Sequence, residues 1–557
     1  MTTARTSDLW WKSAVIYCLD VETFLDWNGD GIGDLVGLTE RIDYLAGIGV
    51  SCIWLMPFQP SPNRDDGYDI TDYYGVDERL GSLGDFVGMI RTAKDRGMRV
   101  IVDLVVNHTS DKHPWFRAAR SSPNSEFRDY YVWADEPPAE PKAEVVFPDA
   151  EDTIWAWDEK AGQYFLHHFY SHQPDLNIAN PKVRAEMAKI VGFWLELGVD
   201  GFRVDAVPFL LETGGVAGDV ELDPHDFLRD LRSFMARRRG DVMMLGEVNL
   251  PHKDLQLFFG GPDGDEVQLL FNFILMQSIY LALARQDARP IAKALRDTVR
   301  KTDDQQYANF LRNHDELTLD KLTDAERQEV FDAFGPEEDM QLFGRGLRRR
   351  LPPMLDGDPQ RIRMAYSLLF SLPGTPVLFY GEEIGMGENL DIEGRLSVRS
   401  PMQWTDEKNA GFSTAPPSRL RRPIGEGRFG PLAVNAAAQR RDPDSLLSWM
   451  ERLIRRRRET PELAWGTWEV LETDQDGVLA HRCDWEGRAV VAVHNLGSEP
   501  CVVRIDLGDI AEGATIDDLL DERAALEELQ DSTIELKLPT YGYRWFRIGA
   551  PGQMTPP

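Results

Sequence analysis

Short apolar runs recur along the chain up to residue 380, and stretches with helical patterning separate them. This alternation is typical of a parallel sheet whose strands are joined by crossover helices. Eight such runs in one chain predict an α/β fold, a closed (β/α)8 TIM barrel with its helices on the outside. The predicted strands are residues 14–17, 52–56, 99–106, 197–205, 242–247, 267–271, 307–311 and 376–380.

Three further segments interrupt or follow this repeat. An interval rich in Pro, Trp and Tyr after the third strand is too long for a loop and predicts an inserted domain. A charged interval after the seventh strand predicts a helical excursion, and short alternating runs near the end predict an antiparallel β-sandwich. The predicted segments are the barrel (1–106 and 177–464), the inserted domain (107–176), the helical excursion (315–360), the C-terminal β-domain (465–549) and a disordered tail (550–557).

The chain is strongly acidic, with 61 Lys and Arg against 93 Asp and Glu and a formal charge of −32. Nucleic acid and anionic membrane surfaces would be repelled, so neither is expected as a partner, and neutral or cationic ligands fit better. Basic runs at 237–239, 348–350 and 455–458 follow helical stretches. We interpret them as solvated helix faces.

Four cysteines are widely spaced and form no CxxC pair, which favours free thiols in a reducing compartment. The first eight residues lack the apolar core of a secretion signal, and no run of about 18 apolar residues occurs. A cytoplasmic protein is expected, provided that the sequence is not a trimmed mature form. No organic cofactor is expected, and the oligomeric state stays open, with a homo-oligomer as one option.

Polar side chains follow four of the predicted strands. A single pair such as Arg203 and Asp205 could be a simple ion pair. Four sets on strands of one barrel converge on a common pocket, because catalytic groups gather at the carboxyl ends of barrel strands. The sets are Asp103, Asn107 and His108; Arg203 and Asp205; Glu247; and His314 and Asp315.

These groups suit the cleavage of a glycosidic bond. An oxocarbenium-like transition state needs one acid to protonate the leaving oxygen and one anion at the anomeric carbon. Clustered carboxylates raise the pKa of at least one member, which keeps an acid protonated near neutral pH. Arg203 shares a strand face with Asp205 and can keep this carboxylate ionised, so Asp205 is the candidate nucleophile.

The segments Asp-Leu-Val-Val-Asn-His, Gly-Phe-Arg-Val-Asp, Gly-Glu-Val and Asn-His-Asp resemble, in order and spacing, the four signature regions of glycoside hydrolase family 13, the α-amylase family. The resemblance covers nearly the whole chain. It implies Asp205 as nucleophile, Glu247 as general acid/base and Asp315 as the residue that binds sugar hydroxyls in the transition state. It also implies a glucose pocket lined by Asp65, Tyr68, His108, Arg203, His314 and Arg395.

Within this family, further segments are similar to the trehalose synthases, which isomerise maltose and trehalose. Gln173 lies in one of them and is assigned to substrate binding. The resemblance implies short α-glucosides as substrates, with an exo-acting α-glucosidase or transglucosylase, or a sugar-binding protein without activity, as alternatives. The similar segments are residues 64–70, 169–177, 313–319, 372–377 and 401–404.

The chain departs from that group on the acceptor side. His168, Leu250, Leu396 and Asp320 stand where other residues are usual. Whether water or the released glucose meets a glucosyl-enzyme decides between hydrolysis and isomerisation. We therefore expect lid residues to control the product. The candidates are Asn249, Glu316 and Asp320, although a helix-capping role for Asp320 is an equal alternative.

Two segments predict structural Ca²⁺ or Mg²⁺ sites with oxygen ligands. The first has alternating donors and wrapping glycines; its alternative is an Asx-rich turn. The second would tie the inserted domain to the barrel. The predicted ligands are Asp26, Asn28, Asp30, Ile32 and Asp34 in the first site, and Asn107, Asp175, the carbonyl of Phe209 and Glu212 in the second.

Overall fold

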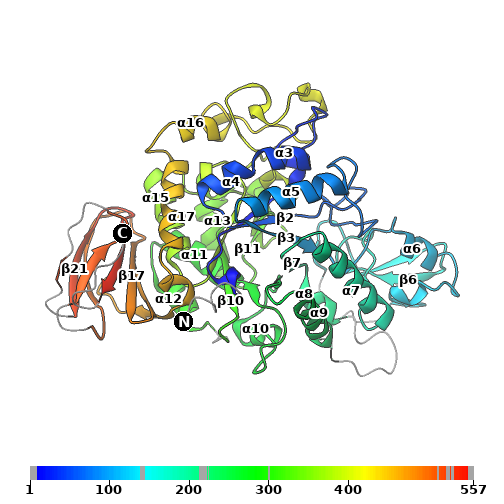
Figure 1. Cartoon of the computed structure of the whole chain (residues 1–557), viewed down its shortest axis with the longest axis horizontal. Helices are drawn as coiled ribbons and strands as arrows, with labels where there is room; N and C mark the ends of the chain where they lie inside the picture. Colours follow the sequence, from blue (N-terminus) through cyan, green and yellow to red (C-terminus); the bar gives the residue numbers. More distant parts are fainter. Residues whose placement is uncertain are drawn as a thin grey trace.

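The structure, a computed structural model, shows a central barrel with one smaller unit at each end of its longest axis (Figure 1). The inserted segment with α6 and β6 lies at one end, and the C-terminal sheets with β17 and β21 lie at the other. The predicted tail, 550–557, lies outside the described residues. The structure describes residues 9–137, 145–212, 223, 225–298, 302–510, 514–521, 527–528 and 532–549.

All eight predicted barrel strands are present, and the predicted fold is confirmed. They close into one sheet in the order β1-β14-β10-β9-β8-β7-β3-β2, and neighbouring strands pair in parallel. The strands are buried on both faces, which explains their continuous apolar runs. They are β1 (Ile16–Leu19), β2 (Cys52–Leu55), β3 (Arg99–Leu104), β7 (Gly201–Val204), β8 (Met243–Gly246), β9 (Leu269–Phe271), β10 (Gln306–Phe310) and β14 (Thr375–Phe379).

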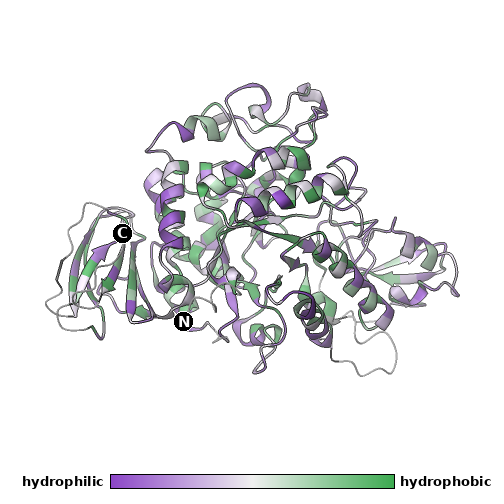
Figure 2. Ribbon diagram, in the orientation of Figure 1, coloured by the Kyte–Doolittle hydropathy of each residue, from purple (hydrophilic) through white to green (hydrophobic). Residues whose placement is uncertain are grey.

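Helices surround the barrel and carry both hydrophobic and hydrophilic turns (Figure 2). In α5, Phe86, Met89, Ile90 and Ala93 recur at helical spacing and are buried, while Ser82 and Asp85 form a capping box at its start. The outer helices include α3 (Leu35–Glu40), α4 (Ile42–Ile48), α5 (Leu83–Asp95), α7 (Pro181–Glu196), α9 (His225–Arg238), α10 (His252–Phe258), α11 (Phe273–Arg285), α12 (Arg289–Arg296), α15 (Pro359–Ser371) and α17 (Leu446–Arg458).

The segment between β3 and α7 holds the short helix α6 (Pro114–Ala119) and a small antiparallel sheet in the order β4-β6-β5. Trp155 packs with Val132, Ile154 and Leu166 in a core of its own. The sheet strands are β4 (Trp133–Ala134), β5 (Trp155–Asp158) and β6 (Gln163–Leu166). This compact unit explains the long aromatic-rich interval in the sequence.

The interval from 315 to 360 is only partly helical. It contains α13 (Asp324–Phe334) and α14 (Leu351–Met354), and also a three-stranded antiparallel sheet in the order β11-β13-β12. The strands have two residues each, too few to show an alternating pattern in the sequence. They are β11 (Leu317–Thr318), β12 (Gln341–Leu342) and β13 (Gly346–Leu347).

The C-terminal domain has two antiparallel sheets with a separate hydrophobic core, which includes Val491, Val503 and Phe546. Trp545 reaches the barrel, where its indole N–H donates to the Ser367 hydroxyl at 3.1 Å. The first sheet has the order β15 (Thr467–Leu471), β16 (Val478–Trp485), β17 (Arg488–Asn495), β22 (Tyr543–Gly549), β19 (Thr515–Asp518) and β20 (Glu527–Glu528), and the second pairs β18 (Cys501–Asp506) with β21 (Thr533–Leu538).

Two of the basic runs are not simple solvated helix faces, so this interpretation was wrong for them. Arg350 is buried and donates to the carbonyls of Val398 and Tyr380. Arg457 is also buried and donates to the carbonyls of Phe370 and Leu372. Both guanidinium groups satisfy backbone acceptors inside the fold, a role that charge patterning alone does not reveal.

Cys18, Cys52 and Cys483 are buried and Cys501 is partly buried, and all four are free thiols. Within the described ranges, every helix is too short or too polar to cross a lipid bilayer.

Candidate active site

Arg203 lies at the centre of the polar cluster, at the carboxyl end of β7. The register pairs it with Asp103 on β3 and with Leu245 on β8, so the barrel brings three strand ends together. The Arg203 guanidinium contacts Asp205 at 2.5 Å and Asp103 at 2.6 Å through Nη1, and Glu247 at 2.7 Å through Nη2. The side chain is 1% exposed, so these contacts are made away from bulk water.

Burial and mutual repulsion change the proton affinities of these carboxyl groups. Burial raises the pKa of Asp205 to about 6, although the Arg203 charge opposes the shift. Burial likewise raises the pKa of Glu247 to about 7, and Asp205 and Asp315 add to the increase. Near neutral pH, Asp205 is therefore mostly ionised while Glu247 retains a substantial protonated fraction.

Asp315 forms a second anionic centre that is held by two arginines. Arg395 donates to it at 2.7 Å and Arg399 at 2.9 Å. Burial alone would raise the pKa of Asp315, but the charges of Arg395 and Arg399 reverse this and lower it. Asp315 therefore stays ionised, which suits its predicted role of accepting hydrogen bonds from sugar hydroxyls. Arg395 also donates to Asp65 at 2.8 Å.

Three predicted sugar-binding residues are buried beside this centre and contact one another. The Tyr68 hydroxyl and His314 Nε2 are 2.7 Å apart, and the two rings stack with centroids 5.7 Å apart. The His108 ring approaches the Tyr68 carbonyl at 3.2 Å. Burial lowers the pKa of both histidines, which keeps them neutral hydrogen-bonding groups.

A pocket of about 420 Å³ opens above these groups, a volume within the usual range of small-ligand sites. The pocket lining does not include Gln173, Arg203 or His314, which contact lining residues instead. Gln173, for example, donates to Asp65 at 2.9 Å. The predicted catalytic and substrate-binding residues that line the pocket are Asp65, Tyr68, His108, Asp205, Glu247, Asn249, Asp315, Glu316 and Arg395.

Residues from two segments outside the barrel form a roof over this pocket. The roof consists of residues 145–147, from the inserted segment, and Arg345, from the turn between β12 and β13; Phe343 of the same turn packs on the roof. Arg345 donates to the Val146 carbonyl at 2.7 Å, and the rings of Phe147 and Phe343 lie 5.3 Å apart. The Arg395 guanidinium stacks on Phe147 from below at 4.8 Å. Phe343 and Gly344 have φ of 56° and 62°, left-handed conformations that form the tight turn between β12 and β13.

The acceptor side carries a hydrogen-bond network that the sequence only partly suggested. Asn249 and Gln277 donate to Asp320 at 2.9 and 3.2 Å, and Lys321 pairs with Asp320 at 2.7 Å. Thr323, and not Asp320, caps α13, so the capping alternative for Asp320 was wrong. The Asn249 Oδ1 atom is buried and finds no donor among the described residues.

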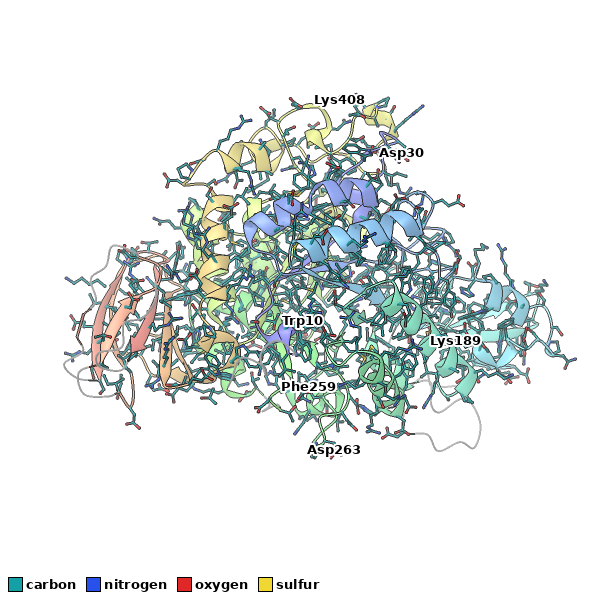
Figure 3. All side chains as sticks on the ribbon, in the orientation of Figure 1. Trp10, Asp30, Lys189, Phe259, Asp263 and Lys408 are labelled. Carbon is teal, nitrogen blue, oxygen red and sulfur yellow. The ribbon has the colours of Figure 1, made fainter. Side chains whose placement is uncertain are left out.

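The first predicted metal segment is a tightly wrapped loop at the periphery, where Asp30 lies close to the Lys408 region (Figure 3). Asp26 accepts from the N–H groups of Gly29 at 2.7 Å and Gly31 at 2.8 Å, and Asp34 accepts from Trp27 at 2.9 Å. These bonds are typical of an Asx-rich turn, which is the alternative to a metal site in this segment.

In the second predicted site, Asn107 donates to Asp175 at 3.1 Å, whereas its Oδ1 is buried without a donor in the described part of the chain. His168 Nδ1 also contacts Asp175, and Phe209 lies beside the His168 ring. The Glu212 side chain lies outside the described residues. Among the residues that the structure describes, no three His, Cys, Asp or Glu side chains cluster closely enough to hold a metal.

Several site residues were missed from the sequence. Arg399 contacts both Asp315 and Asp66, and Asp66 also pairs with Arg422. Trp54 donates to Asp103 at 2.9 Å. The only signal was the spacing of Arg395 and Arg399, four residues apart in a segment without clear periodicity. Arg422 comes from a distant loop that only the tertiary fold brings into place.

Comparison with known proteins agrees with this architecture. Residues 19–332 and 349–466 match the model of the alpha amylase catalytic domain, and residues 487–547 match a sucrose hydrolase-like C-terminal domain. The chain is 40% identical to a trehalose synthase/amylase of Mycolicibacterium smegmatis, over 99% of this chain and 94% of that protein. It is also 40% identical to a trehalose synthase of Pimelobacter sp., over 97% and 96%.

A crystal structure of a trehalulose synthase mutant superposes with a TM-score of 0.76 at 28% identity, covering 97% of this chain and all of that one. The family model alone spans most of the chain, from the first barrel strand to the start of the C-terminal domain. The chain is therefore an enzyme of the α-amylase family, glycoside hydrolase family 13.

Proposed function

We propose that the enzyme isomerises maltose and trehalose, with some hydrolysis, through a covalent glucosyl-Asp205 intermediate. The observation that carries this proposal is the roof over a pocket in which Asp205 and Glu247 share one guanidinium. The names of the relatives, trehalose synthase among them, support the same substrate class.

Asp205 attacks the anomeric carbon while Glu247 protonates the leaving oxygen. The two carboxyl groups contact adjacent nitrogens of Arg203, which favours the short separation of retaining enzymes, about 5–5.5 Å, over the wider one of inverting enzymes. Glu247 then removes the proton from the incoming hydroxyl. Asp315 accepts from the hydroxyls of the glucosyl ring, and Arg395 and Arg399 keep it ionised.

Isomerisation requires that the released glucose stays and rotates before water replaces it. The contacts of Arg345 with Val146 and of Phe343 with Phe147 join the two segments of the roof, which supports the retention of this glucose. The unsatisfied Asn249 Oδ1 offers an acceptor to a sugar hydroxyl on the same side. Excluding water and holding the acceptor are the two conditions that separate an isomerase from a hydrolase.

The function is tested by incubating the enzyme with maltose and separately with trehalose, and by quantifying each disaccharide and free glucose. We expect each disaccharide to form from the other, with glucose as a minor product. Asp205→Asn should reduce turnover on the order of 10⁴-fold or more, whereas Asp332→Asn on the surface of α13 should not. Glucose as the sole product would identify an α-glucosidase. No turnover of either disaccharide would contradict both the isomerase and the α-glucosidase assignments.

The pH dependence follows from the two carboxyl groups. Activity requires ionised Asp205, with a pKa of about 6, and protonated Glu247, with a pKa of about 7. We therefore expect kcat/KM for maltose to fall below pH 6 as Asp205 is protonated, and above pH 7 as Glu247 loses its proton. A profile measured from pH 4.5 to 9 that stays flat would contradict these assignments.

Opening the roof should change the product ratio more than the rate. In Phe343→Ala and Arg345→Met, water reaches the glucosyl-enzyme more easily, so we expect several-fold more glucose per disaccharide formed. Arg327→Met, on α13 of the same excursion, is the matched control. An unchanged ratio of glucose to trehalose in both roof variants would show that the roof does not retain the sugar.

We also propose that the loop from Asp26 to Asp34 holds a structural Ca²⁺, with Asn28, Asp30 and the Ile32 carbonyl as further ligands. Its donors are hard oxygens, as Ca²⁺ requires. At the second site, the unsatisfied Asn107 Oδ1 favours a cation, although His168 already contacts Asp175.

Removal of Ca²⁺ by EDTA should lower the melting temperature by several degrees, and Ca²⁺ should restore it. Asp30→Ala should weaken this response, whereas Asp297→Ala on an exposed turn should not. Elemental analysis that finds no metal in protein purified with Ca²⁺, together with an unchanged melting temperature, would leave the Asx turns as the whole explanation of the loop.

A further inference from the structure

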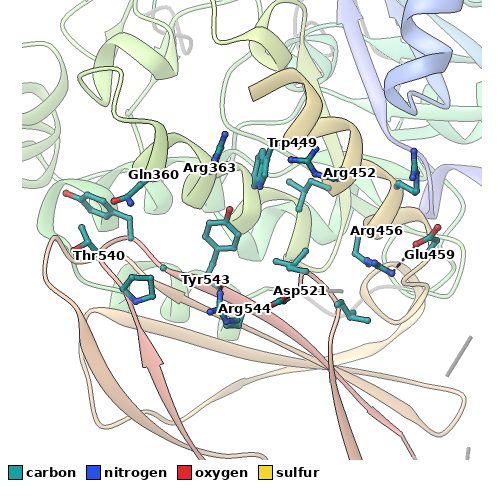
Figure 4. A pocket seen from close by; sticks show the side chains of 17 residues that line it. Gln360, Arg363, Trp449, Arg452, Arg456, Glu459, Asp521, Thr540, Tyr543 and Arg544 are labelled. Atoms are coloured by element: carbon teal, nitrogen blue, oxygen red, sulfur yellow. Dashed lines mark hydrogen bonds and ion pairs between the residues drawn. The ribbon is translucent and has the colours of Figure 1, made fainter. Parts of the chain in front are cut away.

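A second cleft, of about 620 Å³, lies between the barrel and the C-terminal domain (Figure 4). Helices α15 and α17 form one wall, and β22 with its preceding turn forms the other. None of its residues lines the active-site pocket. The cleft includes part of the basic run at 455–458, which the catalytic chemistry does not use.

The charge of this cleft is opposite to that of the protein. Its lining has five arginines and two carboxylates, although the whole chain carries a formal charge of −32. The arginines are Arg363, Arg452, Arg455, Arg456 and Arg544. A local concentration of guanidinium groups on an otherwise anionic protein attracts an anion to this place.

Two of these arginines already have anionic partners. Arg456 pairs with Glu459 at 3.3 Å, and Arg544 pairs with Asp518 at 3.4 Å. Ion pairs of this kind are common where two domains meet. They account for the positions of Arg456 and Arg544, but not for those of the other three arginines.

The other three retain free donors. Within the part of the chain that the structure describes, the Arg455 guanidinium has no hydrogen bond or ion pair. Arg452 donates to the Pro443 carbonyl at 3.0 Å and has no carboxylate partner there. Arg363 donates to the Asp444 carbonyl, while its buried Nε finds no acceptor among the described residues. Guanidinium groups with spare donors match the several oxygens of a phosphate.

Two aromatic rings lie between these arginines. Trp449 on α17 and Tyr543 on β22 both line the cleft and pack edge to face, with centroids 6.1 Å apart and planes at 72° (Figure 4). The Arg363 guanidinium lies 6.0 Å from the Trp449 ring. An aromatic surface beside cationic groups suits a ligand with a ring next to its anionic end.

We propose that this cleft binds a small phosphate ester, with the phosphate on the arginines and the attached ring against Trp449 and Tyr543. The ligand contacts both α17 and β22, so its binding joins the barrel to the C-terminal domain. The ester is a sugar phosphate or a nucleotide, since the phosphate and the ring are common to both.

Isothermal titration calorimetry at low ionic strength tests this site with glucose 6-phosphate, ATP and inorganic phosphate as separate probes. We expect saturable 1:1 binding of at least one ester, tighter than that of inorganic phosphate, and the preferred ester shows which ring the cleft accepts. Arg452→Gln combined with Arg455→Gln should weaken this binding at least tenfold, and Trp449→Leu should weaken the ester but not inorganic phosphate.

Arg237→Gln, on the distant helix α9, is the control and should bind like the wild type. Turnover of maltose by each variant reports correct folding, because none of these residues lies in the catalytic pocket, and the binding result does not depend on which product forms. No saturable binding of either ester up to about 10 mM, binding of inorganic phosphate alone, or equal affinity in the double arginine variant would overturn the proposal.

Discussion

The active site depends on one buried cation. Arg203 contacts Asp103, Asp205 and Glu247 at once, and all of these groups lie at or just after the carboxyl ends of three adjacent barrel strands. Without Arg203, three carboxyl groups in a site of low polarity would repel one another and take up protons. With it, Asp205 stays ionised near neutral pH while Glu247 remains a usable acid. The closed barrel makes this possible, because it places the ends of β3, β7 and β8 side by side.

Much of this arrangement could be predicted from the sequence. Barrel strands are buried on both faces and read as apolar runs, and their polar ends mark Asp205, Glu247 and Asp315 as a converging set. Contacts between distant loops could not be predicted in this way. Arg399, Asp66 and Arg422 form part of the site, but their positions depend on tertiary packing and leave no periodic signal. The sheet β11-β13-β12 was missed because its strands have only two residues each.

The basic runs show the limit of charge patterning in the same way. Arg350 and Arg457 belong to runs that resemble solvated faces, yet both are buried on backbone carbonyls. Neighbours of Arg457 face the cleft between the domains instead. The net charge predicts that large polyanions are repelled in general, but it does not describe a local surface on which arginines from α15, α17 and β22 meet. The same segment of sequence therefore contributes both to the core and to a candidate ligand site.

In the proposed isomerisation, the glucose released from maltose stays beneath the roof and becomes the acceptor. This retention is tested most directly by converting unlabelled maltose in the presence of excess ¹³C-labelled glucose and analysing the trehalose by mass spectrometry. We expect trehalose that is almost entirely unlabelled, because the roof formed by residues 145–147 and Arg345 slows exchange with glucose in solution. Trehalose with one labelled glucose unit, in proportion to the label in solution, would show that the acceptor enters from outside and that the released glucose is not retained.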